Sequence, residues 1–407
     1  MSLSVSFLLA ILSIATFIGP LIGELISVPG AVVELVIGIG LSRVITPVDY
    51  APSSVISSLG ELGFLILMFL VGLEIDFRQL LGAARGAVVM GVGLFAASLG
   101  LSALVLGHLA GASPIWVLAG AATSVGITVP ILYVQGWMGQ HFGHDILLVG
   151  SVTEVVYLGA LNILSVASRH DSLTTSVLLG SRVTLFFLFA FGLVRLFQRS
   201  RSRVPRHFHR WFRRDDPIEV GLRGTFALLF VVVAFAGIIR IPTVLGALLA
   251  GVIFRGVIGN ARAIIERLTS VANSFFIPLF FLTVGLQTPL HASVVSLLPL
   301  IGLILVVLSV SRLVIVPYLK ARGHSWRLSL AGAVMLMAPL TLLVTTAEIG
   351  RSAGFLGPRN YSAIIFVAVL SSVLFPVLAR LLLPTYGSDV EVVHPFDNEE
   401  ESPSDSA

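Results

Sequence analysis

The chain alternates between long apolar runs and short polar turns. The runs are about twenty residues long, the length at which a helix crosses the hydrocarbon core of a bilayer. Charged residues and clusters of Gly and Pro mark the turns. The pattern predicts an all-α polytopic membrane protein with about thirteen transmembrane helices. The predicted spans are 3–23, 29–45, 55–75, 83–108, 114–134, 143–168, 174–198, 218–238, 242–258, 264–287, 293–319, 326–350 and 359–384.

Composition agrees with this fold class and narrows the function. Hydrophobic residues make up 56% of the 407 residues and charged residues 11%, and the mean hydropathy is +1.02. A soluble domain of this length needs a more highly charged surface. The absence of Cys excludes thiol chemistry and Cys-ligated metals. Because no catalytic, phosphate-binding or metal-binding motif occurs, we expect no enzyme, cofactor, resident metal or nucleic-acid partner.

Basic residues in the loops predict how the chain crosses the membrane. The loops after the third, seventh, ninth and eleventh spans are the most basic, and cytoplasmic loops carry an excess of Lys and Arg. These loops contain Arg78 and Arg85, the Arg199–Arg214 cluster, Arg262 and Arg267, and Lys320, Arg322 and Arg327. We therefore expect a lipid-embedded protein of a prokaryotic inner (plasma) membrane, with its N-terminus outside and its C-terminus cytoplasmic. The first span is expected to be retained, because it lacks a basic region and a cleavage site.

Two pairs of segments resemble each other at one offset. Residues 28–43 resemble 241–256, and residues 61–75 resemble 273–287; Pro29 and Pro242 are 213 residues apart, and so are Gly72 and Gly285. The offset covers seven spans, so the second copy enters the membrane from the opposite side. Such inverted repeats are typical of secondary transporters. The predicted division is 1–173 for the first repeat, 174–217 for a linker helix and basic loop, 218–385 for the second repeat, and 386–407 for a disordered acidic tail.

Helix-breaking residues recur in the fifth and twelfth spans, which the repeat makes symmetry mates. The fifth span contains Thr123, Ser124, Gly126, Thr128 and Pro130, and the twelfth contains Pro339 and Thr341. Pro removes a backbone donor and frees a carbonyl one turn earlier. Crossed, unwound helices at mid-membrane expose carbonyls and helix ends that bind ions in transporters. Each Pro could instead only kink a packed helix, but the symmetric pair favours an ion site.

Two ionisable residues lie deep within predicted spans. A charge is energetically costly there, so such residues are rare and usually mark a functional site. Glu154 lies near the middle of LLVGSVTEVVYLGALNIL, next to Thr153 and without a cation in the same span. Arg312 lies inside LVVLSVSRLVIVPYL and is the natural charge partner of Glu154. A permanent ion pair is one interpretation. The other is a carboxylate that binds a proton and a cation in turn.

The motifs VPGAVVELVIGIGLS, LGELGFLILMFLVGLEIDF, AATSVGITVPIL, GHDILLVGSVTEVV, FFIPLFFLTVGL and SRLVIVPYLKARGHSWRLSLAGAVML follow one another in this order. In order and spacing they resemble the monovalent cation:proton antiporter-2 family, which includes glutathione-gated potassium-efflux antiporters and bacterial sodium/proton antiporters. The resemblance runs from about residue 5 to residue 385. It implies a homodimer in which spans one to three and eight to ten form a scaffold, and the remaining repeat helices form a mobile core that carries the ion.

The resemblance also assigns the residues of the site. Glu154 stands where the family has an essential Asp, eleven residues after the Gly that opens the helix, here Gly143. Thr153 takes the preceding position, at which electrogenic members have a second Asp. Arg312 takes the place of an intramembrane Lys or Arg. With one titratable carboxylate, an electroneutral one-for-one exchange is expected.

These features together predict a secondary transporter that exchanges a monovalent cation, K⁺ or Na⁺, for protons by elevator-type alternating access. Glu154 would bind either a cation or a proton, and Arg312 would hold the vacant carboxylate. Oxygens of Thr153, Thr123 and Ser124, together with freed carbonyls, would complete the ion site. Two other classes remain open: a sodium-coupled symporter of an organic anion, and a gated cation channel or transport-silent sensor.

Overall fold

The computed structural model describes residues 5–26, 28–42, 55–74, 85–109, 113–167, 181, 219–239, 242–258, 262–288 and 294–383. Throughout these ranges the regular structure is helical. Nine of the described helices are long and apolar enough to cross a membrane, and two shorter apolar helices accompany them. The described residues therefore have the all-α, multi-pass character that the sequence predicts.

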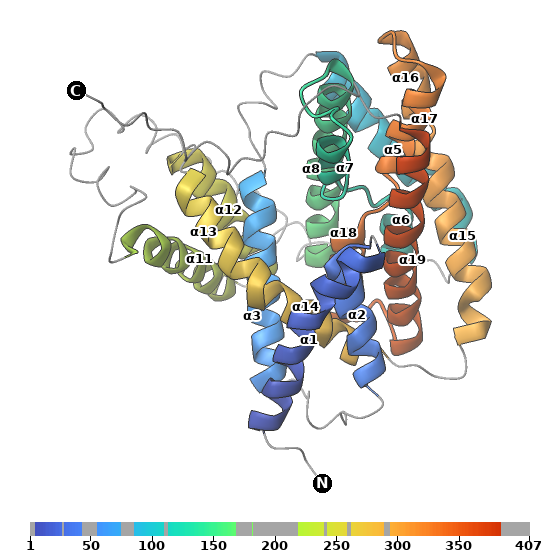
Figure 1. The fold of residues 1–407 in the computed structure, drawn as a ribbon. Helices are drawn as coiled ribbons and strands as arrows, with labels where there is room; N and C mark the ends of the chain where they lie inside the picture. Colours follow the sequence, from blue (N-terminus) through green and yellow to red (C-terminus); the bar gives the residue numbers. More distant parts are fainter. Residues whose placement is uncertain are drawn as a thin grey trace, which may run out of the picture.

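The helices pack in two groups, which lie side by side in Figure 1. We call the first group the panel: α1 (Val5–Ile26), α2 (Gly30–Leu41), α3 (Val55–Glu74), α11 (Val220–Ile238), α12 (Thr243–Ile258), α13 (Arg262–Val271), the π-helix η2 (Ala272–Phe276) and α14 (Ile277–Leu286). We call the second group the core: α5 (Arg85–Leu109), α6 (Pro114–Ala121), α7 (Thr128–Val134), α8 (His141–Ala167), α15 (Val294–Arg312), α16 (Ile315–Ala321), α17 (Trp326–Met335), α18 (Leu340–Ser352) and α19 (Pro358–Leu382).

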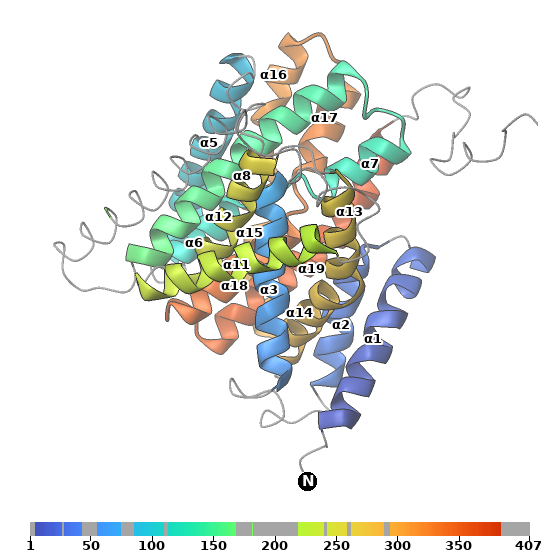
Figure 2. The same ribbon diagram turned by 90° about the vertical axis from the view of Figure 1, so that its left-hand side faces the viewer.

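Contacts run mainly within each group. In the panel, α3 packs against α12 and α14, and α2 packs against α1 and α14. In the core, α5 packs against α6, α8 and α15, and α19 packs against α17 and α18. Between the two groups, α2 packs against α19. The second view shows α1 at one edge of the panel, beside α2 (Figure 2).

The predicted spans agree with the described helices within a few residues at each end. The exception is 174–198, which lies outside the described residues apart from the helical residue 181. The Arg199–Arg214 cluster and the tail 386–407 also lie outside them. The fifth, eleventh and twelfth predicted spans each contain two helices instead of one, and the tenth contains the π-helical turn of η2.

Two close helix contacts hold the panel together. A Cβ added to Gly38 on α2 would lie 3.0 Å from the Cα of Gly285 on α14, and one added to Gly72 on α3 would lie 3.1 Å from the Cα of Gly251 on α12. Only Gly allows the backbones to approach this closely. A shift of 213 residues turns each contact into the other, as an inverted repeat requires. The repeat itself stays a prediction, which these contacts support.

Two core helices break at mid-length. The stretch 122–127 separates α6 from α7, and the stretch 336–339 separates α17 from α18. A Pro ring clashes with the carbonyl four residues earlier in a helix. Pro339 therefore ends α17 at Met335, and Pro130 prevents the helix from continuing through the residues before it. The prediction of broken helices in the fifth and twelfth spans is confirmed.

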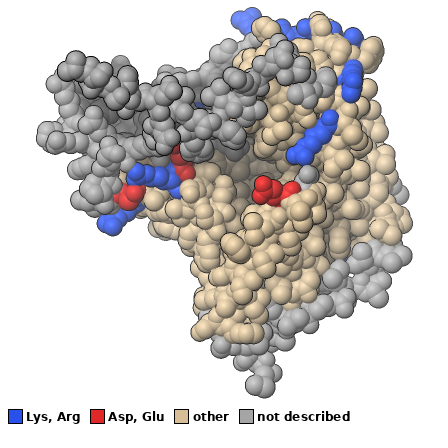
Figure 3. Space-filling view, in the orientation of Figure 1, with Lys and Arg blue, Asp and Glu red and all other residues tan. Residues whose placement is uncertain are grey.

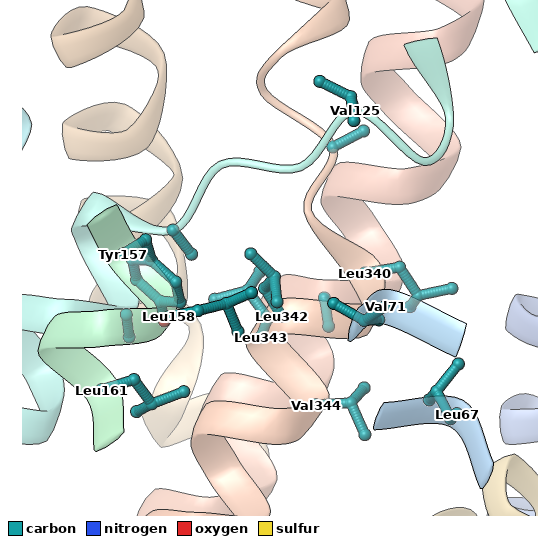
Figure 4. Close-up of a cluster of buried hydrophobic side chains, with 14 of the residues drawn as sticks. Leu67, Val71, Val125, Tyr157, Leu158, Leu161, Leu340, Leu342, Leu343 and Val344 are labelled. Atoms are coloured by element: carbon teal, nitrogen blue, oxygen red, sulfur yellow. The ribbon is translucent and has the colours of Figure 1, made fainter. Parts of the chain in front are cut away.

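An apolar layer lies between the panel and the core. Leu67 and Val71 of α3 lie beside Leu340 and Val344 of α18 (Figure 4). All four side chains are buried. The layer adjoins the unwound stretches of the broken helices, and it offers an ion no polar group through which to pass. The panel and the core therefore meet through apolar side chains beside the broken helices.

The surface is consistent with a membrane environment. The described part of the face in Figure 3 is largely uncharged, with Lys and Arg at its upper right and its left, and acidic side chains at its left and near its centre. On α1, Phe17 is 71% exposed and Leu25 is 85% exposed. Exposed apolar side chains of this size favour contact with lipid or with another protein over contact with water.

Candidate functional site

Glu154 lies in the middle of α8, on the face directed at the first break. Its side chain is 7% exposed. One carboxylate oxygen accepts a hydrogen bond from the Ser124 hydroxyl at 3.2 Å, and the other accepts one from the Val125 backbone N–H at 3.0 Å. A buried carboxylate is strongly unfavourable unless such bonds, a cation or a proton stabilise it. Glu154 therefore ties α8 to the unwound stretch 122–127.

The same stretch offers further oxygen atoms. Ser124 Oγ accepts a hydrogen bond from the Gly126 N–H at 3.2 Å as well as donating to Glu154. Thr123 is fully buried, and its hydroxyl has no hydrogen-bond partner among the residues that the structure describes. Buried hydroxyls normally have a partner, so this one calls for an explanation. A cation that binds oxygen ligands beside Glu154 would supply that partner.

Arg312 reaches the other side of the same break from the end of α15. It is fully buried, and its Nη2 donates to the carbonyls of Ala121, at 2.8 Å, and of Ala122. Its Nη1 donates to the hydroxyls of Ser311, at 3.0 Å, and of Ser98. The last carbonyls of a helix have no partner within the helix, and the end that they form is negative. Arg312 therefore caps and neutralises the C-terminal end of α6.

The predicted contact between Arg312 and the vacant carboxylate of Glu154 stays a prediction. The hydrogen bonds of Arg312 in this structure lead to the end of α6 and to two hydroxyls. Its Nε is buried and has no hydrogen-bond partner within the described ranges. Arg312 thus holds the start of this break through two carbonyls, and Glu154 holds its middle through an amide and a hydroxyl.

Thr128 connects the two breaks. This first residue of α7 is fully buried, and its hydroxyl donates to the carbonyl of Met335, the last residue of α17, at 3.2 Å. Gly150 of α8 packs against both breaks, because a Cβ there would lie 2.5 Å from the Val125 side chain and 3.0 Å from that of Leu336. Both breaks and α8 therefore meet in one region of the core.

The other predicted residues of the broken helices lie at the edges of this region. Gly126 and Pro130 are exposed, on the unwound stretch and in the first turn of α7 respectively. Pro339 is buried directly before α18, and the partly exposed Thr341 lies in the first turn of that helix. Their backbones shape the two breaks.

Thr153 is directed away from the first break. Its hydroxyl donates to the carbonyls of Val149, at 2.8 Å, and of Gly91 on α5, at 3.0 Å. The side chain is fully buried in the contact between α5 and α8. The structure thus brings Ser124 to Glu154, with Thr123 next to Ser124 in the chain, and uses Thr153 to join α8 to α5.

Other acids in the spans make local contacts. Glu34 is 3% exposed and lies in the contact between α2 and α1, since a Cβ added to Gly19 would lie 2.7 Å from its Cγ. Glu348 accepts hydrogen bonds from Arg351 and, at 3.1 Å, from the Tyr361 hydroxyl near the end of α18. Neither carboxylate bonds to a break.

Sequence reasoning missed two polar contacts of the core. Ser98 on α5 accepts a hydrogen bond from Arg312, and the hydroxyl of Tyr157 on α8 bonds to that of Thr346 on α18. All of these side chains are buried. The available signal was a single polar side chain within an apolar run, which does not by itself identify the partner.

Comparison with known proteins identifies the family. The family model described as sodium/hydrogen exchanger, transmembrane, matches residues 11–383. This match covers both breaks, Glu154 and Arg312. The chain belongs to the sodium/hydrogen exchanger family. The resemblance that the motifs carry is thereby confirmed, and the family is one of transporters.

Several relatives of this chain are cation/proton antiporters by name, and one is named as an iron transporter. The chain is 29% identical over 399 residues to the putative Na⁺/H⁺ antiporter YjbQ of Bacillus subtilis, with 93% of this chain and 63% of that protein covered. It is 24% identical over 390 residues to a Na⁺/H⁺ antiporter of Enterococcus hirae, with 92% and 96% covered. It is 21% identical over 353 residues to the K⁺/H⁺ antiporter 1 of Saccharomyces cerevisiae, with 80% and 39% covered. The chain thus spans less than two thirds of YjbQ.

A solved structure has a similar fold. The sodium proton antiporter MjNhaP1 of Methanocaldococcus jannaschii, at pH 8, matches with a TM-score of 0.57 and 16% identity, over 92% of this chain and 97% of that one. At this identity the likeness establishes the fold alone. It confirms the all-helical fold of this chain.

A second buried acid lies on α8, nine residues before Glu154 and so about 14 Å away along the helix. Asp145 accepts hydrogen bonds from Arg322 Nη2 at 3.0 Å and Nε at 3.2 Å, and it bonds to His324 Nε2 at 2.9 Å. The hydrogen bonds with Asp145 raise the pKa of Arg322. This cluster ties the start of α8 to the turn between α16 and α17, so it holds core helices together away from the breaks.

Proposed function

We propose that this exchanger is an antiporter that exchanges a monovalent cation, K⁺ or Na⁺, for protons at Glu154. One observation carries the proposal: the buried carboxylate of Glu154 bonds to Ser124 and Val125 in an unwound stretch of helix. A carboxylate in this position binds a cation or a proton in place of those bonds. Because one carboxylate binds one of the two at a time, the ions compete, and competition at a site with alternating access produces antiport.

The remaining ligands are oxygen atoms of the first break. The unpartnered hydroxyl of Thr123, the hydroxyl of Ser124 and the freed carbonyls join the carboxylate of Glu154. Na⁺ and K⁺ both bind all-oxygen sites, and relatives are named as Na⁺/H⁺ and as K⁺/H⁺ antiporters. Thr153 supports this site indirectly, since its hydroxyl holds α8 against α5.

The exchange is electroneutral in our proposal. Among the described residues, Glu154 is the acid bonded to a break, whereas Asp145 on the same helix is engaged by Arg322 and His324. One carboxylate exchanges one proton for one monovalent cation, so no net charge moves. Arg312 is the charge partner in this scheme: with its unpartnered Nε it approaches the carboxylate when neither ion is bound.

The core moves against the panel in our proposal, as in an elevator. The separation of the helices into two groups joined by an apolar layer supports this movement. The panel would form the interface of a homodimer, for which the exposed apolar face of α1 is suited. We further propose an inverted repeat of 1–173 and 218–385, and a plasma-membrane orientation with the N-terminus outside and the C-terminus cytoplasmic, as the basic loops predict.

Reconstituted liposomes with an acidic interior test the proposal directly. A pH-sensitive dye reports the interior while Na⁺, K⁺ or Li⁺ is added outside, in the presence and absence of a membrane potential. The wild type is expected to dissipate the gradient with one or two of these cations, independently of the potential. Glu154→Gln is expected to lose the exchange, because an amide neither releases a proton nor offers a negative charge.

Glu34→Gln is the matched control, because it neutralises an equally buried carboxylate in the panel, away from both breaks. It is expected to keep the exchange. If no cation dissipates the gradient through the wild type, or if Glu154→Gln exchanges ions normally, antiport at Glu154 is wrong. A rate that follows the membrane potential would refute electroneutrality alone.

A further inference from the structure

We propose that Tyr157 is a positioning residue for cation binding, whose hydroxyl fixes α8, and with it Glu154, against the second broken helix. This inference rests on the proposed function and adds a residue that acts through Glu154. The hydroxyl of Tyr157 bonds to that of Thr346 on α18, the helix that follows the second break.

One face of α8 carries the contacts with both broken helices. Gly150, Glu154 and Tyr157 follow one another at helical spacing, so they lie along the same face. Gly150 packs against both breaks, and Glu154 bonds to the first. Tyr157 extends this face to α18. The carboxylate is therefore flanked by a close contact on one side and by a hydrogen bond on the other.

The direction of this hydrogen bond follows from its neighbours. The hydroxyl of Thr346 donates its one proton to the Leu342 carbonyl at 2.6 Å. The Tyr157 hydroxyl must therefore donate to Thr346. The ring of Tyr157 is fully buried and meets Phe95 of α5 edge to face, at 6.4 Å between ring centroids. Both the ring and the hydroxyl are thus held in place.

The surroundings make this directional bond important. Tyr157 lies beside Leu158, Leu342 and Leu343 in a buried apolar cluster (Figure 4). Apolar packing is favourable in many registers, because it has no preferred direction, whereas a hydrogen bond specifies distance and angle. The bond to Thr346 thus selects one register of α8 against α18.

Loss of this hydroxyl is expected to weaken ion binding and to leave translocation intact. When α8 shifts against α18, the carboxylate of Glu154 moves relative to the hydroxyls of Thr123 and Ser124. The ion then meets its ligands at less favourable distances in every state of the cycle. A change that weakens binding uniformly raises KM without lowering the maximal rate.

Two substitutions remove one hydroxyl each at nearly constant volume: Tyr157→Phe and Thr346→Val. Exchange by each reconstituted variant gives KM and the maximal rate for the transported cation, and cation-dependent thermal stabilisation in detergent gives binding without transport. We expect each variant to raise KM about five- to tenfold, because this factor corresponds to the loss of one hydrogen bond. The maximal rate should stay within about twofold of the wild type. The double variant should be no worse than either single one, and Thr346→Ser should restore the wild-type KM.

Tyr361→Phe is the matched control, since Tyr361 is as buried as Tyr157 and its hydroxyl bonds to Glu348 away from the breaks. It should keep the wild-type KM. An unchanged KM in Tyr157→Phe, a lower maximal rate alone, or an equal rise in KM in the control overturns the inference. A wild type that neither exchanges cations nor is stabilised by them refutes the proposed function, and the positioning role with it.

Discussion

The length of the Glu154 side chain decides which atoms its carboxylate reaches. Its two oxygens bond to different groups of the break, a hydroxyl at 3.2 Å and a backbone N–H at 3.0 Å. An Asp at this position would hold the carboxylate one methylene farther from the unwound stretch. The Glu154 side chain therefore has the length that it needs to reach both groups of the break.

Glu154→Asp should keep the exchange but bind the cation more weakly. The variant retains a titratable carboxylate, but the shorter side chain holds it farther from the hydroxyls of Thr123 and Ser124 that share the cation, a loss comparable to one hydrogen bond, about 1 kcal/mol. We expect KM for the cation to rise at least about fivefold, measured in liposomes beside Glu154→Gln, which should be inactive. A wild-type KM in the Asp variant would show that the reach of Glu is unimportant.

Broken helices need their ends capped, and the core does this with side chains from other elements. Arg312 of α15 donates hydrogen bonds to the carbonyls at the end of α6. The Thr128 hydroxyl of α7 donates one to the last carbonyl of α17. A helix end buried without such partners leaves unpaired polar groups in a medium that cannot hydrate them. The cap by Arg312 is therefore a condition for the first break.

Arg312→Gln should destabilise the protein more than it changes ion preference. It leaves buried carbonyls and hydroxyls without their donor, at about 1–3 kcal/mol each. Arg312→Lys should recover part of the loss, because an ammonium keeps the charge but lacks the planar fork. Thermal unfolding in detergent measures the effect, with Arg351→Gln, at a half-exposed ion pair, as the control. Equal stability of Arg312→Gln and this control would contradict the capping role.

Across the whole molecule, the two groups of helices meet through apolar side chains beside the breaks. Leu67 and Val71 of the panel lie against Leu340 and Val344 of the core (Figure 4). Such a contact can be broken and formed again without leaving hydrogen-bonding groups unpaired. A rigid-body movement of the core would have to open it.

A cross-link through this layer should stop transport. The chain has no Cys, so Val71→Cys with Leu340→Cys gives a single pair of thiols. Oxidation or a short bis-thiol reagent should abolish exchange in liposomes, and cleavage of the link should restore it. Phe64→Cys with Phe280→Cys joins two stacked residues within the panel and should leave exchange active. Full activity of the linked Val71–Leu340 protein would exclude movement of the core against the panel.

Much of this architecture is readable from local features of the sequence. Apolar runs of membrane length predicted the spans. Lipid offers no hydrogen-bond partners, so a chain that crosses it must pair its own backbone groups in helices or closed barrels. Pro130 and Pro339 predicted the breaks through a clash that acts over four residues. Glu154 and Arg312 stood out because a charge in an apolar run is unfavourable there. In each case the physical cause lies within one segment of chain.

Partners across the fold were decided only by the tertiary structure. The sequence offered Thr153 as a ligand beside Glu154, but neighbours on a helix point in different directions, and the packing of α8 turns Thr153 toward α5. It offered Arg312 as the partner of Glu154, whereas in this structure the hydrogen bonds of Arg312 go to the end of α6. The bond between Tyr157 and Thr346 joins positions 189 residues apart. Sequence alone thus determined which segments cross the membrane, break or carry charge, whereas the choice of partner depended on helix rotation and register, which only the packed core fixes.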